Sequence, residues 1–322
     1  MAVFSAVFFI CVLKYSHGIN IMAKKLASRG VKAKFFIKDL DSFFSLVRIE
    51  HGVMYGLAVV IGALLAGGFG ALSAAVFIGC VVSLFIEFGA FSLNDFADLK
   101  ADRANRRTDR PLVTKSVSSS AAFSVGIASF ALANALAFIF LDPFAFSVIF
   151  AFSILSVLYD FLLKNLPFVG NAVIALTMAV PFIFGALIVA DISDPSFQPA
   201  LCLSAIAFLV GVGREIMKDI EDVRGDASVG ARTLPVVIGS KNSAGLASVF
   251  FLSSVILSFV PMLTFFSGNL AYLLVLVTDL MLVNLSRELL YARSLQVLRN
   301  GRKASLLAVG IGLIAFLLAA LF

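Results

Sequence analysis

Long runs of apolar residues recur along this chain, separated by short connections that hold most of its polar residues. Nine of the runs approach the roughly 20 residues that an α-helix needs to cross a bilayer. We therefore predict an all-α bundle of about nine transmembrane helices, of which the eighth is the shortest. The predicted spans lie near Gly52–Gly68, Ala71–Phe91, Ala121–Leu141, Phe144–Leu163, Val169–Ala190, Pro199–Ile216, Ala244–Phe266, Leu270–Leu285 and Ser305–Phe322.

The composition supports a polytopic membrane protein. Hydrophobic residues make up 61% of the chain and charged residues only 14%, whereas about a quarter of the residues in a soluble protein are charged. The three cysteines, Cys11, Cys80 and Cys202, lie in apolar stretches without paired spacing. They indicate neither a disulfide framework nor a metal-binding knuckle.

The basic residues predict the orientation of the bundle, because Lys and Arg are retained on the cytoplasmic side of a membrane. They lie before the first span and in the connections after the second, fourth, sixth and eighth spans, at Lys100–Lys115, Lys164, Arg214–Lys241 and Arg287–Lys303. The other connections carry none. We expect the N-terminus in the cytoplasm and the C-terminus outside. The net charge of +6 follows from this retention and from anionic lipids, and nucleic-acid binding is not implied.

The first 43 residues are predicted to form an N-terminal extension and lead-in to a transmembrane domain of residues 44–322. Met1–Leu13 is apolar but short for a span, and it lacks the features of a secretory signal. Met22 is an alternative start of the chain. Phe35–Val47 carries its apolar residues on one side, which is typical of a helix lying at the membrane interface.

Two acidic clusters follow the second and the sixth predicted span, at Asn94–Asp102 and Asp219–Asp226. Charge near the apolar interior of a membrane is costly and tends to mark ion sites or chemistry. Residues four apart share a helix face, which aligns Asn94, Asp98 and Asp102 and, in the second cluster, Asp222 and Asp226. Asp95 falls on another side of its helix, and we expect its replacement to be less costly.

These aligned oxygens suit a divalent metal. Mg²⁺ takes a few protein oxygens and completes its octahedron with water and substrate phosphate. Lys218 and Arg214 lie one and two turns before Asp222 on the same face, and cations beside a metal can hold phosphate oxygens. The two clusters together predict a pocket for Mg²⁺ and a pyrophosphate.

Each cluster also has a plainer explanation, because short cytoplasmic loops are commonly charged and solvated. The presence of both, in basic connections after the second and sixth spans, argues against coincidence. Glu87 lies near the Asn94 stripe but deeper, and it is either a ligand contact or a structural hydrogen-bond partner. Asp279, in the eighth span, is an intramembrane charge without an assigned role.

From about Phe44 onward, the chain resembles the UbiA family of intramembrane prenyltransferases. Asn94–Asp102 matches an Asn-Asp-x-x-Asp-x-x-x-Asp motif after the second helix of that family, and Asp222–Asp226 matches an Asp-x-x-x-Asp motif after the sixth. Asn105, Arg106, Arg110 and Pro111 stand in a stretch similar to the family segment that follows the first motif. The resemblance implies a nine-helix fold and Mg²⁺-dependent transfer of a prenyl group from a prenyl pyrophosphate to a lipid-like acceptor.

The resemblance also implies roles for individual residues. Tyr159 and Lys164 depart from the pattern, since they are separated by four residues where quinone-pathway members have three. Nothing in the sequence indicates an obligatory protein partner. The implied Mg²⁺ ligands and catalytic residues are Asn94, Asp98, Asp102, Asp222 and Asp226. The implied pyrophosphate or substrate contacts are Arg110, Lys164 and Lys218, with Arg106, Tyr159, Asn171 and His51 as further candidates.

Two acceptors remain open. Arg214–Pro235 and Leu163–Asn171 resemble the branch that makes archaeal ether lipids, in which a geranylgeranyl group passes to the hydroxyl of geranylgeranylglyceryl phosphate and gives digeranylgeranylglyceryl phosphate. Arg48–His51 is more like quinone-pathway members, whose acceptor is an aromatic acid such as 4-hydroxybenzoate; His51 is then an acceptor-side group or an interfacial residue. The acceptor phosphate of the first branch would suit the loop cations Arg103, Arg106 and Arg107, which a positively charged cytoplasmic loop also explains.

A transporter is the alternative from another class of protein. A transport path usually needs polar groups near the bilayer midplane, whereas these carboxylates cluster at one face beside arginines. A purely structural membrane protein would need neither cluster. The sequence therefore favours a transferase.

Overall fold

The computed structural model describes residues 40–228, 230–265, 269–291 and 295–321, and these ranges are helical without a strand. Nine helices in this part of the chain are long and apolar enough to cross a membrane, which confirms the predicted fold class. They are α3 (Ile49–Gly67), α4 (Ala74–Ala97), α6 (Ser119–Phe140), α7 (Pro143–Leu158) with its continuation η2 (Tyr159–Leu163), α8 (Val169–Leu187), α9 (Gln198–Ser228), α11 (Ser240–Thr264), α12 (Asn269–Tyr291) and α13 (Leu295–Leu321).

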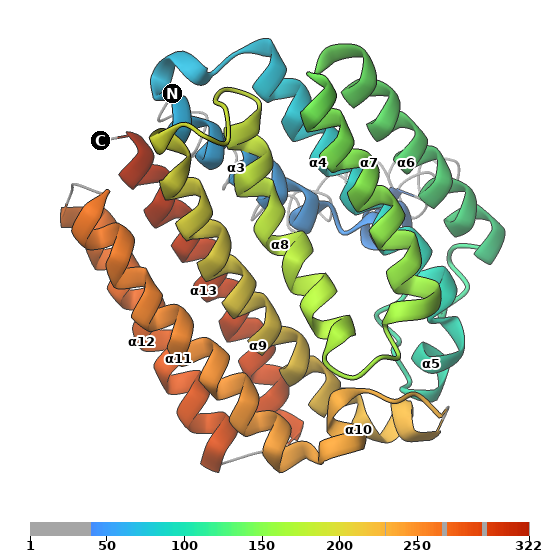
Figure 1. Ribbon diagram of the computed structural model, residues 1–322. Helices are drawn as coiled ribbons and strands as arrows, with labels where there is room; N and C mark the ends of the chain where they lie inside the picture. The colour runs from blue at the N-terminus through green and yellow to red at the C-terminus, as the bar shows by residue number, and fades with distance from the viewer. Residues whose placement is uncertain (1–39, 229, 266–268, 292–294, 322) are drawn as a thin grey trace, which may run out of the picture.

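The helices form a bundle whose long axes run in broadly the same direction (Figure 1). Along one side α9, α11, α12 and α13 pack together, and α4, α6 and α7 form the other side. α3 and α8 lie between, and α13 packs on α3 as well as on α12. Two short helices, α5 (Leu99–Ala104) and α10 (Leu234–Ile238), lie at the same end of the bundle (Figure 1).

The N-terminal extension is described only at its end. Residues 1–39, with Met22 and the apolar start, lie outside the described residues, and residues 40–47 are helical. Leu46 and Val47 are fully buried, and Leu46 packs with Leu112 and Ala122. Arg48 then turns the chain into α3 with a left-handed backbone, φ 47°. This last part of the predicted interface helix is therefore anchored against the bundle.

α4 and α9 continue beyond the predicted spans, which ended at Phe91 and Ile216 where the polar residues begin. α4 extends to Ala97 and α9 to Ser228. Polar side chains in these extensions bind partners on neighbouring segments, such as Asp95 with Arg48 and Asp222 with Arg107, so the backbone stays helical without turning charge toward lipid. The α9 extension carries the second acidic cluster, and the α4 extension carries the start of the first, which continues into α5.

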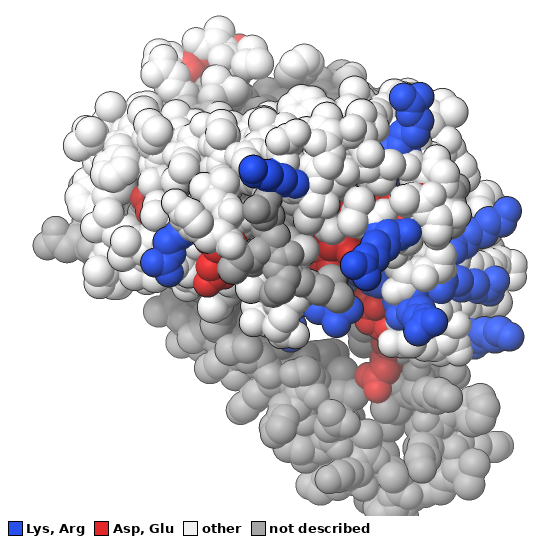
Figure 2. Space-filling model, turned by 90° about the horizontal axis from the view of Figure 1, so that it is seen from below, with Lys and Arg blue, Asp and Glu red and all other residues white. Residues whose placement is uncertain are grey.

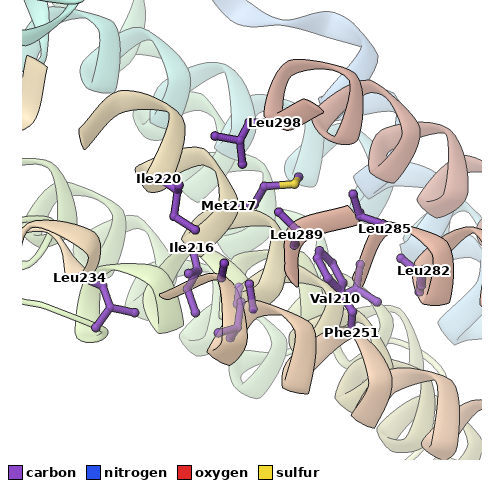
Figure 3. Packing of buried hydrophobic residues seen from close by; sticks show 14 of the residues in the cluster. Val210, Ile216, Met217, Ile220, Leu234, Phe251, Leu282, Leu285, Leu289 and Leu298 are labelled. Atoms are coloured by element: carbon purple, nitrogen blue, oxygen red, sulfur yellow. The ribbon is translucent and has the colours of Figure 1, made fainter. Parts of the chain in front are cut away.

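The apolar face of α9 is held by the largest core cluster. Ile216 and Met217 of α9, Phe251 of α11, Leu285 of α12 and Leu298 of α13 are buried together (Figure 3). Burial of side chains of this size stabilises the fold by about 1.5 to 3 kcal/mol each relative to water. With this face packed, the Arg214 and Lys218 side of α9 is left for the interior cavity.

Two glycines let α3 and α8 approach closely. A Cβ at Gly62 would lie 2.0 Å from the carbonyl oxygen of Phe182, and a Cβ at Gly185 would lie 2.0 Å from that of Val59. No other residue fits at these distances without separating the helices. Small residues of this kind bring the backbones of membrane helices into contact.

Candidate active site

The first acidic cluster forms where α4 ends and α5 begins. The Asn94 side-chain amide donates to Asp98 Oδ2 and to Asp160 Oδ1, both at 3.0 Å. α4 ends at Ala97, yet the backbone N–H groups of Asp98 and Asp102 still donate four residues back, each at 2.8 Å. The predicted shared face of Asn94 and Asp98 is therefore present. Buried Asp160 joins them, although no spacing in the sequence connected it to this cluster.

A π turn explains the spacing of Tyr159 and Lys164. Residues Tyr159–Leu163 are wound as a π-helix, and the Lys164 backbone N–H donates to the Tyr159 carbonyl five residues back at 3.0 Å. The extra residue is thus absorbed within one widened turn, a feature often found at functional sites. Lys164 Nζ forms an ion pair with Asp98 Oδ1. Lys164 therefore reaches the first acidic cluster even though its spacing from Tyr159 differs from that of the family.

Asp95 holds two arginines, although it lies on a different side of α4 from Asn94 and Asp98. Its Oδ1 accepts from Arg48 Nη2 at 2.6 Å and from Arg110 Nη1 at 3.1 Å, and the Asp95 side chain is 1% exposed. Arg48 also stacks over the Phe91 ring at 4.2 Å. Asp95 thus positions one predicted pyrophosphate contact, Arg110, and one cation that the sequence did not assign, Arg48.

The second acidic cluster is joined to the first by the loop after α5. Arg107 Nη1 donates to Asp222 Oδ2 at 3.0 Å, and Thr233 Oγ1 donates to Asp226 Oδ2 at 3.2 Å. Asn105 also hydrogen-bonds Asp226. Its amide lies where a Cβ on Gly225 would be, 1.6 Å from the Asn105 oxygen. The glycine between the two aspartates therefore allows the loop to reach them.

Asn171 is buried beside the second acidic cluster, whereas Arg106 is exposed. The buried Asn171 amide of α8 donates to Asp219 Oδ2 at 2.7 Å, so it supports the second cluster from the side. Arg106 is exposed and has a left-handed backbone, φ 53°. Neither residue lines the interior cavity among its described residues.

Acidic and basic side chains gather at one end of the bundle. Seen from that end, acidic groups lie near the middle of the face and basic groups lie beside them (Figure 2). Burial, followed by repulsion from Asp98 and Asp95, raises the pKa of the Asp102 carboxyl to about 7. Burial alone would lower the pKa of Arg107, but Asp222 and Asp109 raise it above its ordinary value. Negative charge is therefore crowded at this end, and a cation relieves it.

The donor atoms fit Mg²⁺. The two clusters offer carboxylate and amide oxygens, and Mg²⁺ needs only one or two carboxylates when phosphate and water complete its shell. Within the described residues, no three His, Cys, Asp or Glu side chains lie together as a ready metal site. Asp98 and Asp222 are instead paired with Lys164 and Arg107. The carboxylates of Asp98 and Asp222 could exchange these side-chain cations for Mg²⁺ when the metal binds together with a phosphorylated substrate.

A cavity of about 230 Å³ lies between the helices next to these clusters. Five of the predicted site residues line it: His51, Asn94, Arg110, Tyr159 and Lys218. Asp98 and Lys164 connect to it through Asn94, and Asp222 lies one turn beyond Lys218 on α9. The carboxylates are thus placed at the edge of a cavity whose far wall is apolar, with Val275, Leu313 and Phe316 among its lining.

Two carboxyl groups lie deeper in the cavity wall. Glu87 is 4% exposed and lines the cavity from α4. Asp279, the unassigned charge of the eighth span, lines it from α12 and accepts from Ser258 Oγ at 2.8 Å. Asp279 therefore faces the bundle interior with a partner, as intramembrane carboxyl groups commonly do.

His51 lies on α3 at the polar end of the cavity. Its ring meets the Phe91 ring edge to face, with centroids 5.1 Å apart. Its Nδ1 has no hydrogen-bond partner among the described residues and lies 3.6 Å from Glu50 Oε1. This geometry is compatible with either role considered for His51, an acceptor-side group or an interfacial residue.

Comparison with known proteins gives a consistent result. Residues 55–300 match the UbiA prenyltransferase family. The digeranylgeranylglyceryl phosphate synthase of Archaeoglobus fulgidus is 38% identical over 291 residues, which cover 89% of this chain and 98% of that protein. The synthase of the same name from Pyrococcus furiosus is 36% identical over 286 residues, 88% of this chain and 98% of its own length.

Solved structures share the fold. One, described as giving structural and mechanistic insights into the biosynthesis of digeranylgeranylglyceryl phosphate synthase in membranes, aligns with a TM-score of 0.68 at 25% identity, covering 88% of this chain and 99% of that one. A UbiA homolog from Archaeoglobus fulgidus bound to GPP and Mg²⁺ aligns with a TM-score of 0.59 at 19% identity, covering 85% and 99%. The second likeness bears on the fold alone.

Proposed function

The chain belongs to the UbiA prenyltransferase family, and we propose that it transfers a geranylgeranyl group from geranylgeranyl pyrophosphate to the free hydroxyl of geranylgeranylglyceryl phosphate. The product is digeranylgeranylglyceryl phosphate, and the reaction depends on Mg²⁺. The observation that carries the proposal is the 38% identity over 98% of a synthase of that name. The site agrees with it, because two acidic clusters paired with cations adjoin a cavity whose far side is lined by apolar residues.

The proposed Mg²⁺ ligands are Asn94, Asp98 and Asp102 on one side and Asp222 and Asp226 on the other. When bound, Mg²⁺ neutralises the pyrophosphate and favours its departure from the allylic carbon. The two sets come from α4–α5 and from α9, which the Arg107–Asp222 pair holds together at one end of the bundle. A pyrophosphate between them would be reached from both sides.

The basic residues would exchange partners when the donor binds. Lys164 now pairs with Asp98 and Arg107 with Asp222. If those carboxylates held the metal, Lys164 and Arg107 would be free to hold phosphate oxygens, as Arg110 and Lys218 are placed to do from the cavity wall. Charge-assisted hydrogen bonds of this kind position the leaving group.

The cavity would protect the reacting carbon from water. The allylic carbon–oxygen bond to the pyrophosphate breaks, the acceptor oxygen forms an ether bond to that carbon, and the hydroxyl proton is released. Tyr159 and Phe91 line the polar end of the cavity, and aromatic faces stabilise developing positive charge without attacking it. The apolar part of the wall, formed by Val275 of α12 and by Leu313 and Phe316 of α13, suits an isoprenoid chain.

The bundle is proposed to sit with the acidic clusters and the N-terminus in the cytoplasm and the C-terminus outside. This orientation is supported by the basic residues, which lie with the acidic clusters at one end, and by the retention of such residues on the cytoplasmic side. Both substrates would then reach the site from the cytoplasmic leaflet.

A transfer assay on purified protein tests the function. We expect product from geranylgeranyl pyrophosphate, Mg²⁺ and geranylgeranylglyceryl phosphate, none with 4-hydroxybenzoate as acceptor, and none after chelation of the metal. A prenylated aromatic acid as the only product would overturn the proposal and move the enzyme to a quinone pathway.

A further inference from the structure

A second group of cations lies in the cavity where α9 meets α13, next to Glu221 of the second acidic cluster. Arg214 of α9 lines the cavity with Arg302 and Ser305 of α13. Arg214 Nη1 donates to Ser305 Oγ at 2.8 Å, and Ser305 Oγ donates to the Arg302 carbonyl at 2.9 Å. Arg302 Nη1 in turn donates to Glu221 Oε2 at 2.9 Å. Two helices thus bring guanidinium groups to one part of the wall.

Arg214 differs from the other cations of this cavity. Among the described residues, five Arg or Lys side chains line the cavity, and Arg214 alone has no carboxylate within 4.0 Å. Glu215, the next residue in the chain, acts on Arg214 from a distance, but its carboxylate is in contact with Lys218 instead. A largely buried guanidinium with no carboxylate in contact is costly. Its planar fork of donors matches a phosphate. An anion from outside the chain would therefore complete this site.

The position of Arg214 separates it from the proposed pyrophosphate site. Arg214 lies two turns before Asp222, about 12 Å along the axis of α9, with Lys218 between them. In a reactive complex the acceptor oxygen and the allylic carbon lie about 3 to 3.5 Å apart. The remaining distance leaves room for the glycerol unit of an acceptor, with the pyrophosphate at one end and a second phosphate group at the other.

We propose that Arg214 and Arg302 bind the phosphate group of the acceptor, with Ser305 holding Arg214 in place. The inference rests on the proposed function, since only a phosphorylated acceptor requires such a site. The acceptor phosphate is then bound by α9 and α13, and not by the arginines in and after α5 that the sequence suggested. Arg103 and Arg106 are exposed, and neither they nor Arg107 belong to the described lining of the cavity.

The test compares two acceptors that differ only in the phosphate: geranylgeranylglyceryl phosphate and the same glycerol ether without it. For Arg214→Gln, we expect the KM for the phosphorylated acceptor to rise about 30-fold or more, as when one partner of a buried charge pair is removed. The KM for geranylgeranyl pyrophosphate should stay unchanged, and the variant should match the wild type on the phosphate-free acceptor. Lys303→Gln, an exposed position on α13, serves as the control.

Other variants keep the test decisive if Arg214→Gln folds poorly. Arg214→Lys keeps the charge but loses the fork of donors, and we expect an intermediate KM for the phosphorylated acceptor. Ser305→Ala should move the same KM in the same direction. An equal loss with both acceptors, or a raised KM for the pyrophosphate donor, would overturn the acceptor-phosphate site.

The two proposals fail in different ways. A wild-type enzyme that ignores geranylgeranylglyceryl phosphate would remove the proposed function and this inference with it. A wild-type enzyme that uses this acceptor, with an Arg214→Gln variant that retains its KM, would remove the inference alone.

Discussion

At the scale of single residues, the metal-binding carboxylates are the most direct test of the site. We expect Asp98→Asn and Asp222→Asn each to reduce transfer by about 100-fold or more, because even partners of metal ligands cost 10- to 100-fold when changed. Each variant should remain folded and inserted, since both side chains are partly exposed, at 29% and 16%. Turnover and thermal unfolding in detergent measure the two effects.

Asp41→Asn provides the matched control for this pair. Asp41 is exposed, and no ion pair involves it among the described residues. The same amide substitution there should leave turnover unchanged. Wild-type turnover in Asp98→Asn or Asp222→Asn would remove these aspartates from the proposed metal site.

Asp95 acts through the arginines that it holds. Removing its charge leaves Arg48 and Arg110 without their buried partner, which costs about 3 to 5 kcal/mol when such a pair is broken from one side. We expect Asp95→Asn to lower the melting temperature and to raise the KM for geranylgeranyl pyrophosphate through a displaced Arg110. Helix facing alone led us to expect a less costly replacement of Asp95; its two buried ion pairs lead us to expect a larger loss.

A double-mutant cycle tests whether Asp95 works through Arg110. If Arg110→Gln is added to Asp95→Asn, the further loss in kcat/KM should be smaller than the loss that Arg110→Gln causes in the wild type. Strictly additive losses would mean that the two residues act independently.

Helical spacing predicts contacts within one helix but not contacts between segments that are distant in the sequence. Helical spacing was enough to align Asn94 with Asp98, four residues apart. No periodicity relates Arg48 to Asp95, 47 residues away, or Arg107 to Asp222, 115 residues away. Such pairs depend on which helices become neighbours, and packing decides that.

At the scale of elements, the π turn at Tyr159–Leu163 makes a sharp prediction. Deleting Leu162, an exposed residue in that turn, should convert the five-residue hydrogen bond into an ordinary four-residue one and keep Lys164 facing Asp98. We expect the deletion variant to retain turnover within about tenfold, because π-bulges are single-turn insertions in an α-helix.

Insertion at the same position is the matched comparison. One alanine added after Leu162 should turn the lysine roughly 100° away from Asp98, by the 3.6 residues of each helical turn, and abolish transfer. A deletion variant that is as inactive as the insertion variant would show that the π turn itself is required.

The contact between α3 and α8 makes a second prediction at this scale. Gly62→Ala places a Cβ against the Phe182 carbonyl, and we expect it to destabilise the fold by about 1 to 3 kcal/mol through overpacking. Gly245→Ala, in α11 with open space around its Cβ position, should leave the melting temperature equal or higher, since alanine favours a helix over glycine. Equal melting temperatures of the two variants would mean that α3 and α8 separate freely.

The hydropathy pattern predicted the positions of the helices more accurately than the residues at which they end. The apolar runs located all nine spans that the described part of the chain contains. The ends of α4 and α9 lay beyond the prediction, because their polar residues find partners on neighbouring segments and helix formation does not depend on lipid there. The π turn was visible in the sequence only as one extra residue between Tyr159 and Lys164.

At the scale of the whole molecule, two exposed serines at opposite ends of the bundle allow its orientation in the membrane to be measured. Ser116 lies in the loop with the basic residues after α5, and Ser193 lies in the connection between α8 and α9. In a variant whose native cysteines are replaced, we expect Ser116→Cys to react with a membrane-impermeant thiol reagent only when the cytoplasmic face is exposed, and Ser193→Cys only from outside. The reason is the retention of Lys and Arg in the cytoplasm. Right-side-out and inverted vesicles give the two conditions, and detergent-solubilised protein gives the full labelling of both sites. The reverse pattern would place the acidic clusters outside the cell, and the proposed cytoplasmic supply of both substrates would then be wrong.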